Sequence, residues 1–148
     1  MNPVLVLYYS NHGSTRRLAD AIAQGVTSEN VPVIVRTVPG LKVEEQEDCE
    51  GKSLTTRDSE LDVRLGTINE LDSCSALALG SPTRFGNMAA PMKYFLDSTS
   101  SLWLKGSLID KPACVFTSSS SMHGGQESTL LSMMIPLLHH GMMFCGLP

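Results

Sequence analysis

Three apolar runs in this chain are each followed by a loop rich in Gly, Ser or Pro and then by a helical pattern. The runs are residues 4–9, 76–80 and 112–117, and the first is continuously apolar, like a central strand covered on both faces. Alternation of strands with helices predicts an α/β fold with a parallel sheet. The three loops are then expected to meet at the carboxyl edge of the sheet, where such folds bind ligands.

Two further segments complete the sheet. Residues 31–38 are rich in β-branched side chains, and because Pro32 has no backbone N–H, this strand lies at an edge or begins after the proline. Residues 142–145 begin a fifth strand. We predict one domain over residues 1–148, a three-layer, doubly wound, five-stranded parallel sheet of the flavodoxin-like order 2-1-3-4-5. Because the chain stops at Pro148, the last helix of such a fold is expected to be missing, as in a fragment truncated at its C-terminus.

Helical patterns connect the strands. The first predicts a helix that buries one apolar face, made of Leu18, Ala21, Ile22, Gly25 and Val26. Further helices are expected at 67–72, from near residue 89, and at 126–140, where Pro136 should kink or loosen the helix. Residues 39–66 form an acidic excursion, which is either a mobile solvated segment or a surface that packs on a partner subunit.

Composition and charge exclude several classes of protein. The net charge of −4 argues against nucleic-acid binding, which needs a basic patch, and against attraction to anionic membranes. No apolar stretch approaches the roughly 20 residues of a membrane helix, and no signal-like segment opens the chain, so we expect a cytoplasmic protein without membrane insertion. The four cysteines and four histidines lack zinc-like spacing, so we predict no metal site and expect buried, reduced thiols.

The first loop has the chemistry of a phosphate site. It reads Ser10, Asn11, His12, Gly13, Ser14 and Thr15, with hydroxyls at both ends and a glycine that allows close approach. A helix N-terminus follows, whose backbone N–H groups and dipole favour an anion. The alternative is plain N-capping by Ser14 or Thr15. The loop matches neither a Walker motif nor G-x-G-x-x-G, so a phosphomonoester is favoured over a dinucleotide.

The other two loops suit a flat heterocycle. In residues 81–87, Phe85 can cover a ring and Arg84 can stabilise a developing negative charge. Residues 118–125 offer hydroxyl and amide donors to the other edge of the ring. Taken alone, the second loop is also compatible with an ordinary strand-to-helix connection and the third with a flexible linker. Catalysis by cysteine is disfavoured because no cysteine has a histidine or a helix N-terminus beside it in sequence.

Six segments resemble the WrbA family, whose members are FMN-dependent NAD(P)H:quinone oxidoreductases of flavodoxin-like fold. They are Tyr8-Tyr9-Ser10-x-x-Gly13, residues 80–88 (GSPTRFGNM), Phe95-Leu96-Asp97, Leu102-Trp103, residues 124–127 (GGQE) and residues 139–142 (HHGM). The resemblance runs over the whole chain. It implies tightly bound FMN, NAD(P)H as co-substrate, a quinone substrate, and self-association to a dimer or tetramer with FMN near the subunit interfaces.

The resemblance also implies roles for individual residues. The phosphate would lie against Ser10, Asn11, His12, Gly13, Ser14 and Thr15, and the isoalloxazine between two groups of residues: Pro82, Thr83, Arg84, Phe85 and Gly86, and Ser118, Ser119, Ser120, Ser121, Met122, His123 and Gly124. His140 resembles the family's histidine at the flavin, and Trp103 its aromatic over the substrate face. His12 stands where an aromatic that contacts the nicotinamide is frequent. The alternatives are a partner for the helix dipole at His140 and plain packing at Trp103.

The sequence therefore predicts two-electron reduction of quinones by NAD(P)H through FMN, by hydride transfer between stacked rings in a ping-pong cycle. Two alternatives share the fold: a one-electron carrier of flavodoxin type, and a non-catalytic interaction protein. A carrier docks its partners electrostatically, whereas the acidic residues here concentrate in 44–62, away from the site loops. A phospho-receiver is excluded because the first and third strands lack the acidic residues that hold Mg²⁺.

Overall fold

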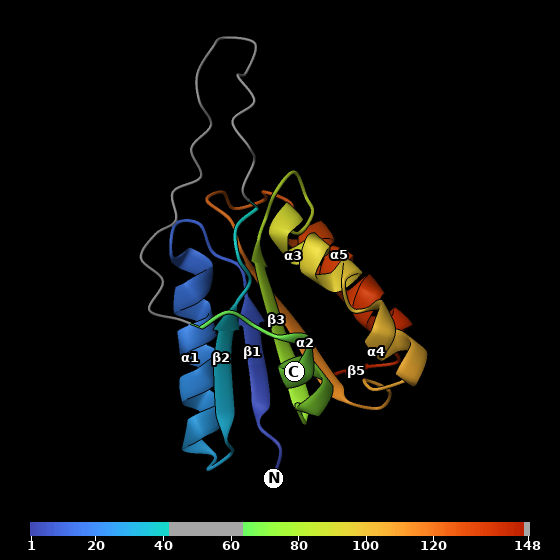
Figure 1. Cartoon of the computed structure of the whole chain (residues 1–148). Helices are drawn as coiled ribbons and strands as arrows, with labels where there is room; N and C mark the ends of the chain where they lie inside the picture. Colours follow the sequence, from blue (N-terminus) through green and yellow to red (C-terminus); the bar gives the residue numbers. More distant parts are fainter. Residues whose placement is uncertain (42–63, 147–148) are drawn as a thin grey trace.

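The computed structural model describes residues 1–41 and 64–146 (Figure 1). Within them, five parallel strands form one sheet in the order β2-β1-β3-β4-β5, which confirms the predicted flavodoxin-like order. The strands are β1 (Val4–Tyr8), β2 (Val33–Thr37), β3 (Ala76–Pro82), β4 (Pro112–Ser118) and β5 (Met143–Phe144). Most of the predicted acidic excursion, residues 39–66, lies outside the described residues.

The continuously apolar strand β1 lies inside the sheet, between β2 and β3. β1 pairs with β2 from Val4 opposite Val33, and with β3 from Val4 opposite Ala76. β2 is an edge strand that begins one residue after Pro32, whose carbonyl accepts the Val4 N–H at 2.8 Å. The sequence predicted that this strand lies at an edge of the sheet or begins after Pro32, and the structure confirms both. The proline lies where no ladder donor is needed.

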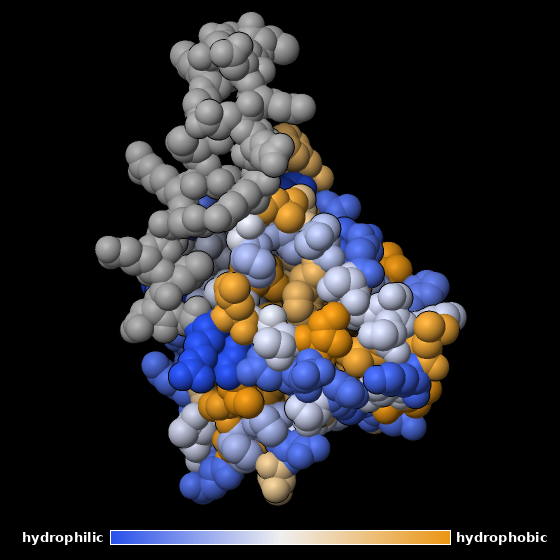
Figure 2. Space-filling view, in the orientation of Figure 1, coloured by the Kyte–Doolittle hydropathy of each residue, from blue (hydrophilic) through white to orange (hydrophobic). Residues whose placement is uncertain are grey.

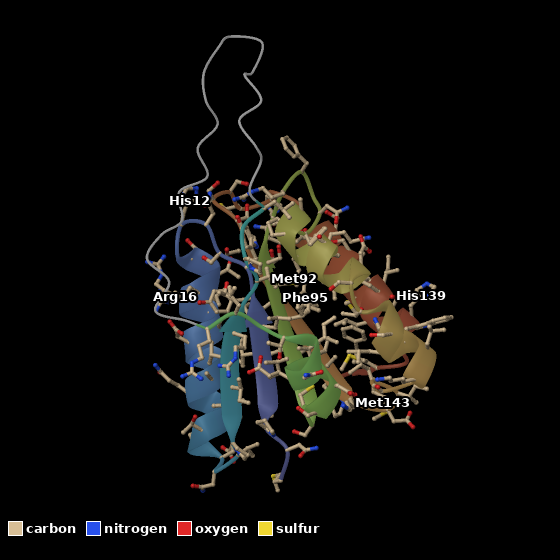
Figure 3. All side chains as sticks on the ribbon, in the orientation of Figure 1. His12, Arg16, Met92, Phe95, His139 and Met143 are labelled. Carbon is tan, nitrogen blue, oxygen red and sulfur yellow. The ribbon has the colours of Figure 1, made fainter. Side chains whose placement is uncertain are left out.

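Helices cover both faces of the sheet (Figure 1). One face carries α2 (Ile68–Ser73), α3 (Ala90–Asp97), α4 (Ser100–Lys105) and α5 (Gln126–His139), whose buried side chains pack on Leu5, Leu7, Leu77 and Leu79. Figure 3 shows Met92 and Phe95 of α3 pointing toward the sheet. The other face carries α1 (Ser14–Ser28), which packs on Val6, Tyr8 and Ala78. Successive strand residues thus serve opposite cores, as the pleat requires.

The predicted buried face of α1 is partly wrong. Leu18, Ala21 and Gly25 are exposed, whereas Thr15, Ala19 and Ala23 are buried. These buried residues recur every four positions and are small, so their stripe lets the helix lie close to the sheet. The predicted helix itself is confirmed. Its longer apolar side chains, Leu18, Ile22 and Val26, lie at the sides of the surface through which α1 packs on the sheet.

The sheet face beside α1 is incompletely covered in the described residues. No helix follows β5 there, and aliphatic side chains of β1, β3 and β4 line a hollow of about 140 Å³. No helix in the described part of the chain is long and apolar enough to cross a membrane. Of the cysteines expected to be buried, Cys74 is buried and Cys114 half-buried, but Cys145 is exposed, so that expectation is wrong for Cys145. Cys49 lies outside the described residues.

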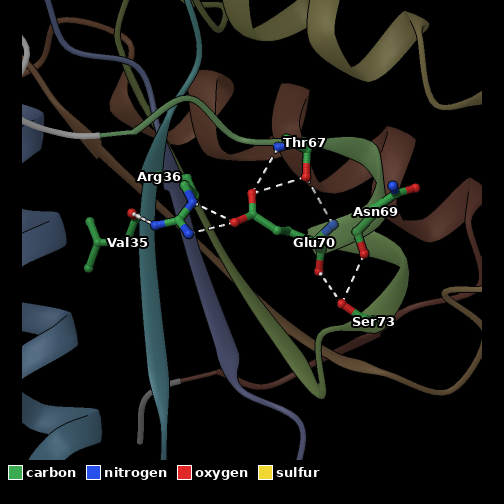
Figure 4. A network of polar contacts seen from close by, with 6 residues as sticks. All are labelled: Val35, Arg36, Thr67, Asn69, Glu70 and Ser73. Carbon is green, nitrogen blue, oxygen red and sulfur yellow. Dashed lines mark hydrogen bonds and ion pairs between the residues drawn. The ribbon is translucent and has the colours of Figure 1, made fainter.

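An ion pair ties α2 to the edge strand (Figure 4). Arg36 of β2 donates from Nε to Glu70 Oε1 at 2.6 Å, and its second guanidinium nitrogen lies 2.6 Å from the same oxygen. Glu70 also accepts the Thr67 backbone N–H at 3.0 Å, while Thr67 Oγ1 accepts the Glu70 N–H at 3.2 Å. This reciprocal capping box starts α2. Burial alone would raise the pKa of Glu70, but the bonds from Arg36 and Thr67 outweigh it and lower that pKa.

Replacing Glu70 with Gln is expected to lower the free energy of unfolding at pH 7 by about 1–2 kcal/mol. The carboxylate has a lowered pKa in the folded state, so its contribution is complete above its ordinary value of 4.5 and is lost as the pH falls through the folded-state pKa. Urea unfolding at pH 7 and pH 4 should therefore show the gap between wild type and Glu70→Gln narrowing at the lower pH. Glu29→Gln, at the exposed end of α1, is the control, and an equal loss there would contradict this reading.

Candidate functional site

Three loops enclose a pocket at the carboxyl edge of the sheet. Its volume is about 420 Å³, which is within the range of small-molecule sites. Figure 3 shows His12 at this end of the molecule. Every lining residue belongs to the set that the sequence predicted: Asn11, His12, Ser14, Pro82, Thr83, Arg84, Phe85, Ser118, Ser119, Ser120, Ser121 and Gly124. The three loops therefore converge as expected, and we call this space the loop pocket.

The N-terminus of α1 lies open at this pocket. Its N-cap is Gly13, with φ of 83°, and no side chain caps it, so the structure does not show the alternative of capping by Ser14 or Thr15. Ser10 Oγ instead accepts the Gly13 N–H at 3.0 Å, and Thr15 Oγ1 lies 2.9 Å from Ser118 Oγ. The first backbone N–H groups of a helix have no intrahelical acceptor. They and the Ser14 hydroxyl can therefore serve an anion.

A tight turn shapes the second loop. Arg84 and Asn87 exchange backbone hydrogen bonds of 2.8 and 3.0 Å, and the two residues between them, Phe85 and Gly86, have φ of 51° and 72°. Positive φ at both central positions defines a type I′ turn. Phenylalanine rarely adopts this conformation, and such strain costs about 1–3 kcal/mol and gathers at functional sites. The turn holds the Phe85 ring fully exposed at the rim of the pocket.

Hydroxyls from α5 and β3 brace this second loop from behind. Ser132 Oγ accepts the Met88 N–H at 3.0 Å, and Ser81 Oγ accepts the Ala89 N–H at 2.8 Å. The buried Thr129 Oγ1 lies 3.2 Å from Thr83 Oγ1 and 2.8 Å from the Gly125 carbonyl. Sequence reasoning missed Thr129 and Ser132. The sequence signal that could have identified them is the presence of two hydroxyl residues within an otherwise apolar helical segment.

The third loop is held by its own hydrogen bonds. Gln126 Nε2 donates to the carbonyls of Ser121 at 2.7 Å and Met122 at 3.2 Å, and Ser119 Oγ accepts the Ser121 N–H at 3.2 Å. These bonds disfavour the alternative of a flexible linker. Met122 and His123 lie at the exposed tip and do not line the loop pocket. Their predicted contacts with a cofactor stay predictions.

The second and third loops touch at two glycines. A Cβ on Gly125 would come within 2.9 Å of Gly86 Cα, a distance that real Cβ atoms do not adopt against backbone. Gly125 is also the N-cap of α5, with φ of 83°. This contact fixes how close the 84–87 turn comes to the serine loop, and therefore the width of the pocket.

Trp103 and His140 line a different pocket. This space, about 530 Å³, lies between α3, α4 and α5 and is lined by both apolar and polar side chains, with Lys93 and Asp97 among the polar ones. The sequence-predicted pair is thus brought together, but neither member lines the loop pocket of the same chain. Trp103 Nε1 donates to the His139 carbonyl at 2.9 Å while 57% of the residue stays exposed, which is more exposure than plain packing would leave.

The hydrogen bonds of His140 fix its protonation. Thr99 Oγ1 lies 2.6 Å from the Leu96 carbonyl, to which it donates, and 2.8 Å from His140 Nε2, from which it must then accept. Burial lowers the pKa of His140, and the neighbouring His139 lowers it further. The ring is therefore neutral, with its proton on Nε2 and a buried Nδ1 that has no partner among the described residues. Because a neutral ring gains little from a helix dipole, that alternative role is disfavoured.

The walls of the loop pocket are rich in hydrogen-bond donors. No three His, Cys, Asp or Glu side chains gather to hold a metal ion anywhere in residues 1–41 and 64–146. The Arg84 guanidinium donates to the Thr83 carbonyl at 2.9 Å and brings a positive charge to the pocket wall. Hydroxyls, backbone N–H groups and this one cation suit an anionic, flat ligand.

Comparison with known proteins gives consistent matches. A family model described as NADPH-dependent FMN reductase matches residues 3–146. A protein of Geotalea uraniireducens named NAD(P)H dehydrogenase (quinone) is 44% identical over 146 residues, covering 98% of this chain and 71% of that protein. A protein of Geotalea daltonii with the same name is 45% identical over the same shares of both chains. The WrbA-like flavodoxin structure from Agrobacterium tumefaciens superposes with a TM-score of 0.71 at 24% identity, covering 97% of this chain and 76% of that one.

These matches confirm the resemblance to the WrbA family that the sequence motifs indicated. The structural likeness, at 24% identity, supports the fold alone. The family model and the curated relatives also support membership of the family. The model matches residues 3–146, and the two relatives are 44% and 45% identical over 98% of the chain. The chain therefore belongs to the NADPH-dependent FMN reductase family.

Proposed function

We propose that this chain holds FMN in the loop pocket and reduces quinones with NAD(P)H in a ping-pong cycle. The observation that carries the proposal is the loop pocket itself, where an uncapped helix N-terminus lies beside a strained turn with an exposed aromatic ring. The relatives named NAD(P)H dehydrogenase (quinone) and the family of FMN reductases support the reaction class.

The residues present fit FMN. A phosphomonoester suits the N-terminus of α1, where the Ser14 hydroxyl and the serines of the third loop surround the open N–H groups. A Cβ on Gly13 would meet nothing within 4 Å, so no neighbouring atom crowds this turn at the N-terminus of α1. The ring would lie between the 84–87 turn and the 118–124 loop. The pocket volume of about 420 Å³ matches a ligand of this size.

The residues of the chain supply position and electrostatics. FMN held in the loop pocket would supply the hydride-transfer chemistry between NAD(P)H and the quinone. Arg84 stabilises negative charge at the ring, and the backbone donors of the second and third loops hold its edge. Phe85, exposed at the rim, would cover the bound ring. His12 lines the same pocket, which supports the contact with the nicotinamide that the resemblance implies.

Trp103 and His140 then act on the flavin of a second copy. They line a pocket of their own within one chain, so contact with a flavin requires another subunit. The side of the molecule that carries α3, α4 and α5 shows several separate apolar areas (Figure 2). Large apolar side chains are more than half exposed there: Tyr94, Trp103, Leu104, Leu131, Ile135 and Leu138. Three of them, Leu131, Ile135 and Leu138, form one apolar stripe along α5, and burial of this stripe against a second copy supports a dimer or tetramer.

Two measurements test this function. The wild type is expected to quench FMN fluorescence saturably and to oxidise NAD(P)H when benzoquinone is added, whereas a one-electron carrier would bind FMN without this turnover. Trp103→Ala should lower kcat/KM for benzoquinone by about tenfold, because the flat apolar wall of the substrate site is lost, and should leave the FMN Kd unchanged. Leu18→Ala, at an exposed position of α1 on the opposite face of the sheet, is the control. Unchanged kinetics in Trp103→Ala would remove Trp103 from the substrate site.

A further inference from the structure

Two cysteines lie side by side at the edge of the sheet opposite β2: Cys114 in β4 and Cys145 directly after β5. The register of β4 and β5 pairs Pro112 with Met143 and Ala113 with Phe144, so Cys114 and Cys145 form the next pair. The Cys145 N–H donates to the Ala113 carbonyl at 3.0 Å, which continues the ladder to this position. Paired residues of parallel strands point to the same face. Both cysteines accordingly line the hollow of about 140 Å³ beside α1.

The spacing of this pair suits a disulfide. Neighbouring strands lie about 4.7–4.9 Å apart, and the Cα atoms of a disulfide lie about 4.4–6.8 Å apart. β5 has only two residues, so few ladder hydrogen bonds resist the small shift that brings two sulfur atoms into bonding distance. The backbone therefore places the two thiols within reach of each other without a change of fold.

The surroundings of the two thiols differ. Cys145 is exposed, whereas Cys114 is half-buried and packs against the core under α1. Burial raises the pKa of the Cys114 thiol, and the nearby Cys145 raises it further. The remaining lining of the hollow is aliphatic: Val4, Ile22, Val26, Ala76, Leu77, Ala78, Pro112 and Ala113. An exposed thiol thus stands next to a shielded one, with no other side chain of the hollow able to react.

We infer that Cys114 and Cys145 form a modification site, a dithiol that a small-molecule disulfide such as oxidised glutathione converts to an intramolecular disulfide. The Cys145 thiolate attacks one sulfur of the reagent, whose S–S bond breaks and releases one glutathione thiolate. The Cys114 thiolate then attacks the Cys145 sulfur of the mixed disulfide, and the second glutathione leaves. The protein loses two electrons and two protons, and the reagent is reduced to two thiols.

The link would restrain segments that line both pockets. A disulfide between Cys114 and Cys145 closes a loop that contains residues 118–124, all of α5 and His140. Cross-linking a loop of this length removes conformational freedom from the unfolded chain. We expect Tm to rise by roughly 5–10 °C on oxidation.

The test exposes the reduced, folded protein to oxidised glutathione and maps its disulfides by mass spectrometry, all in a Cys49→Ser background. The expected product is lighter than the reduced protein by about 2 Da and joins Cys114 to Cys145. Cys114→Ser should instead keep one glutathionyl group on Cys145, because the second thiol is gone. Cys145→Ser should form no internal link.

Cys74→Ser is the matched control. Cys74 is buried on the opposite sheet face, where its Sγ donates to the Leu71 carbonyl at 3.1 Å, so its replacement should leave the Cys114–Cys145 link intact. Cys114→Ala repeats the test with an apolar side chain should serine disturb the core. A parent Cys49→Ser protein that stops at the mixed disulfide, stays unmodified, or links a different pair would overturn the inference.

Discussion

Gly125→Ala is expected to weaken FMN binding by at least about tenfold, which corresponds to 1.4 kcal/mol. The new Cβ would lie 2.9 Å from Gly86 Cα and 3.3 Å from Ser128 Oγ, and alanine is strained at φ of 83°. Relief requires moving either the 84–87 turn or the first turn of α5, and both hold pocket walls in place. The expected loss of folding free energy is about 1–3 kcal/mol, less than the roughly 5–15 kcal/mol stability of a typical domain, so the variant should still fold.

Flavin fluorescence quenching gives the affinity, and urea unfolding without flavin gives the stability. Gly25→Ala is the matched control, because a Cβ there meets nothing within 4 Å and the residue lies inside α1. It should leave FMN affinity unchanged and raise stability by about 0.5–1 kcal/mol. A Gly125→Ala variant with wild-type affinity would show that the contact between the two loops does not set the pocket.

The strands and the loop pocket could be predicted because local patterns encode them. Continuous apolar runs mark buried parallel strands, and the carboxyl edge of such a sheet is where loops rich in Gly, Ser and Pro gather. Pro32 marked the start of β2 through its missing donor. The buried face of α1 could not be predicted in this way. Whether the helix buries the side that carries Leu18 or the side that carries Ala19 depends on how closely it approaches the sheet, which the sequence pattern does not encode.

The parts that escaped prediction depend on contacts distant in sequence. α4 has only six residues and no side-chain cap, so its pattern is too short to mark a helix. By contrast, α5 (Gln126–His139) agrees with the helix predicted over 126–140, and the kink or loosening expected at Pro136 stays a prediction. Thr129 and Ser132 act on the 83–88 loop more than 40 positions away. No periodicity in the sequence marks hydroxyls that serve such a distant backbone.

Ile135→Asp is expected to disperse the proposed assembly, weakening self-association by at least about a hundredfold. Leu131, Ile135 and Leu138 project from α5 on the face opposite the buried Met133 and Leu137. A carboxylate at the centre of this stripe would have to lose its hydration without a partner, which is costly at an apolar interface. Folding should be preserved, because Ile135 is 56% exposed in a single chain.

Light scattering after size-exclusion chromatography measures the assembly, and benzoquinone reduction measures its consequence. FMN binding should persist in Ile135→Asp, because the loop pocket belongs to one chain, while kcat/KM for benzoquinone should fall by tenfold or more as Trp103 and His140 lose the neighbouring flavin. Leu18→Asp places the same charge on an exposed position of α1, on the other side of the sheet, and should change neither readout. A monomeric wild type with full quinone reduction would show that the site is complete within one subunit.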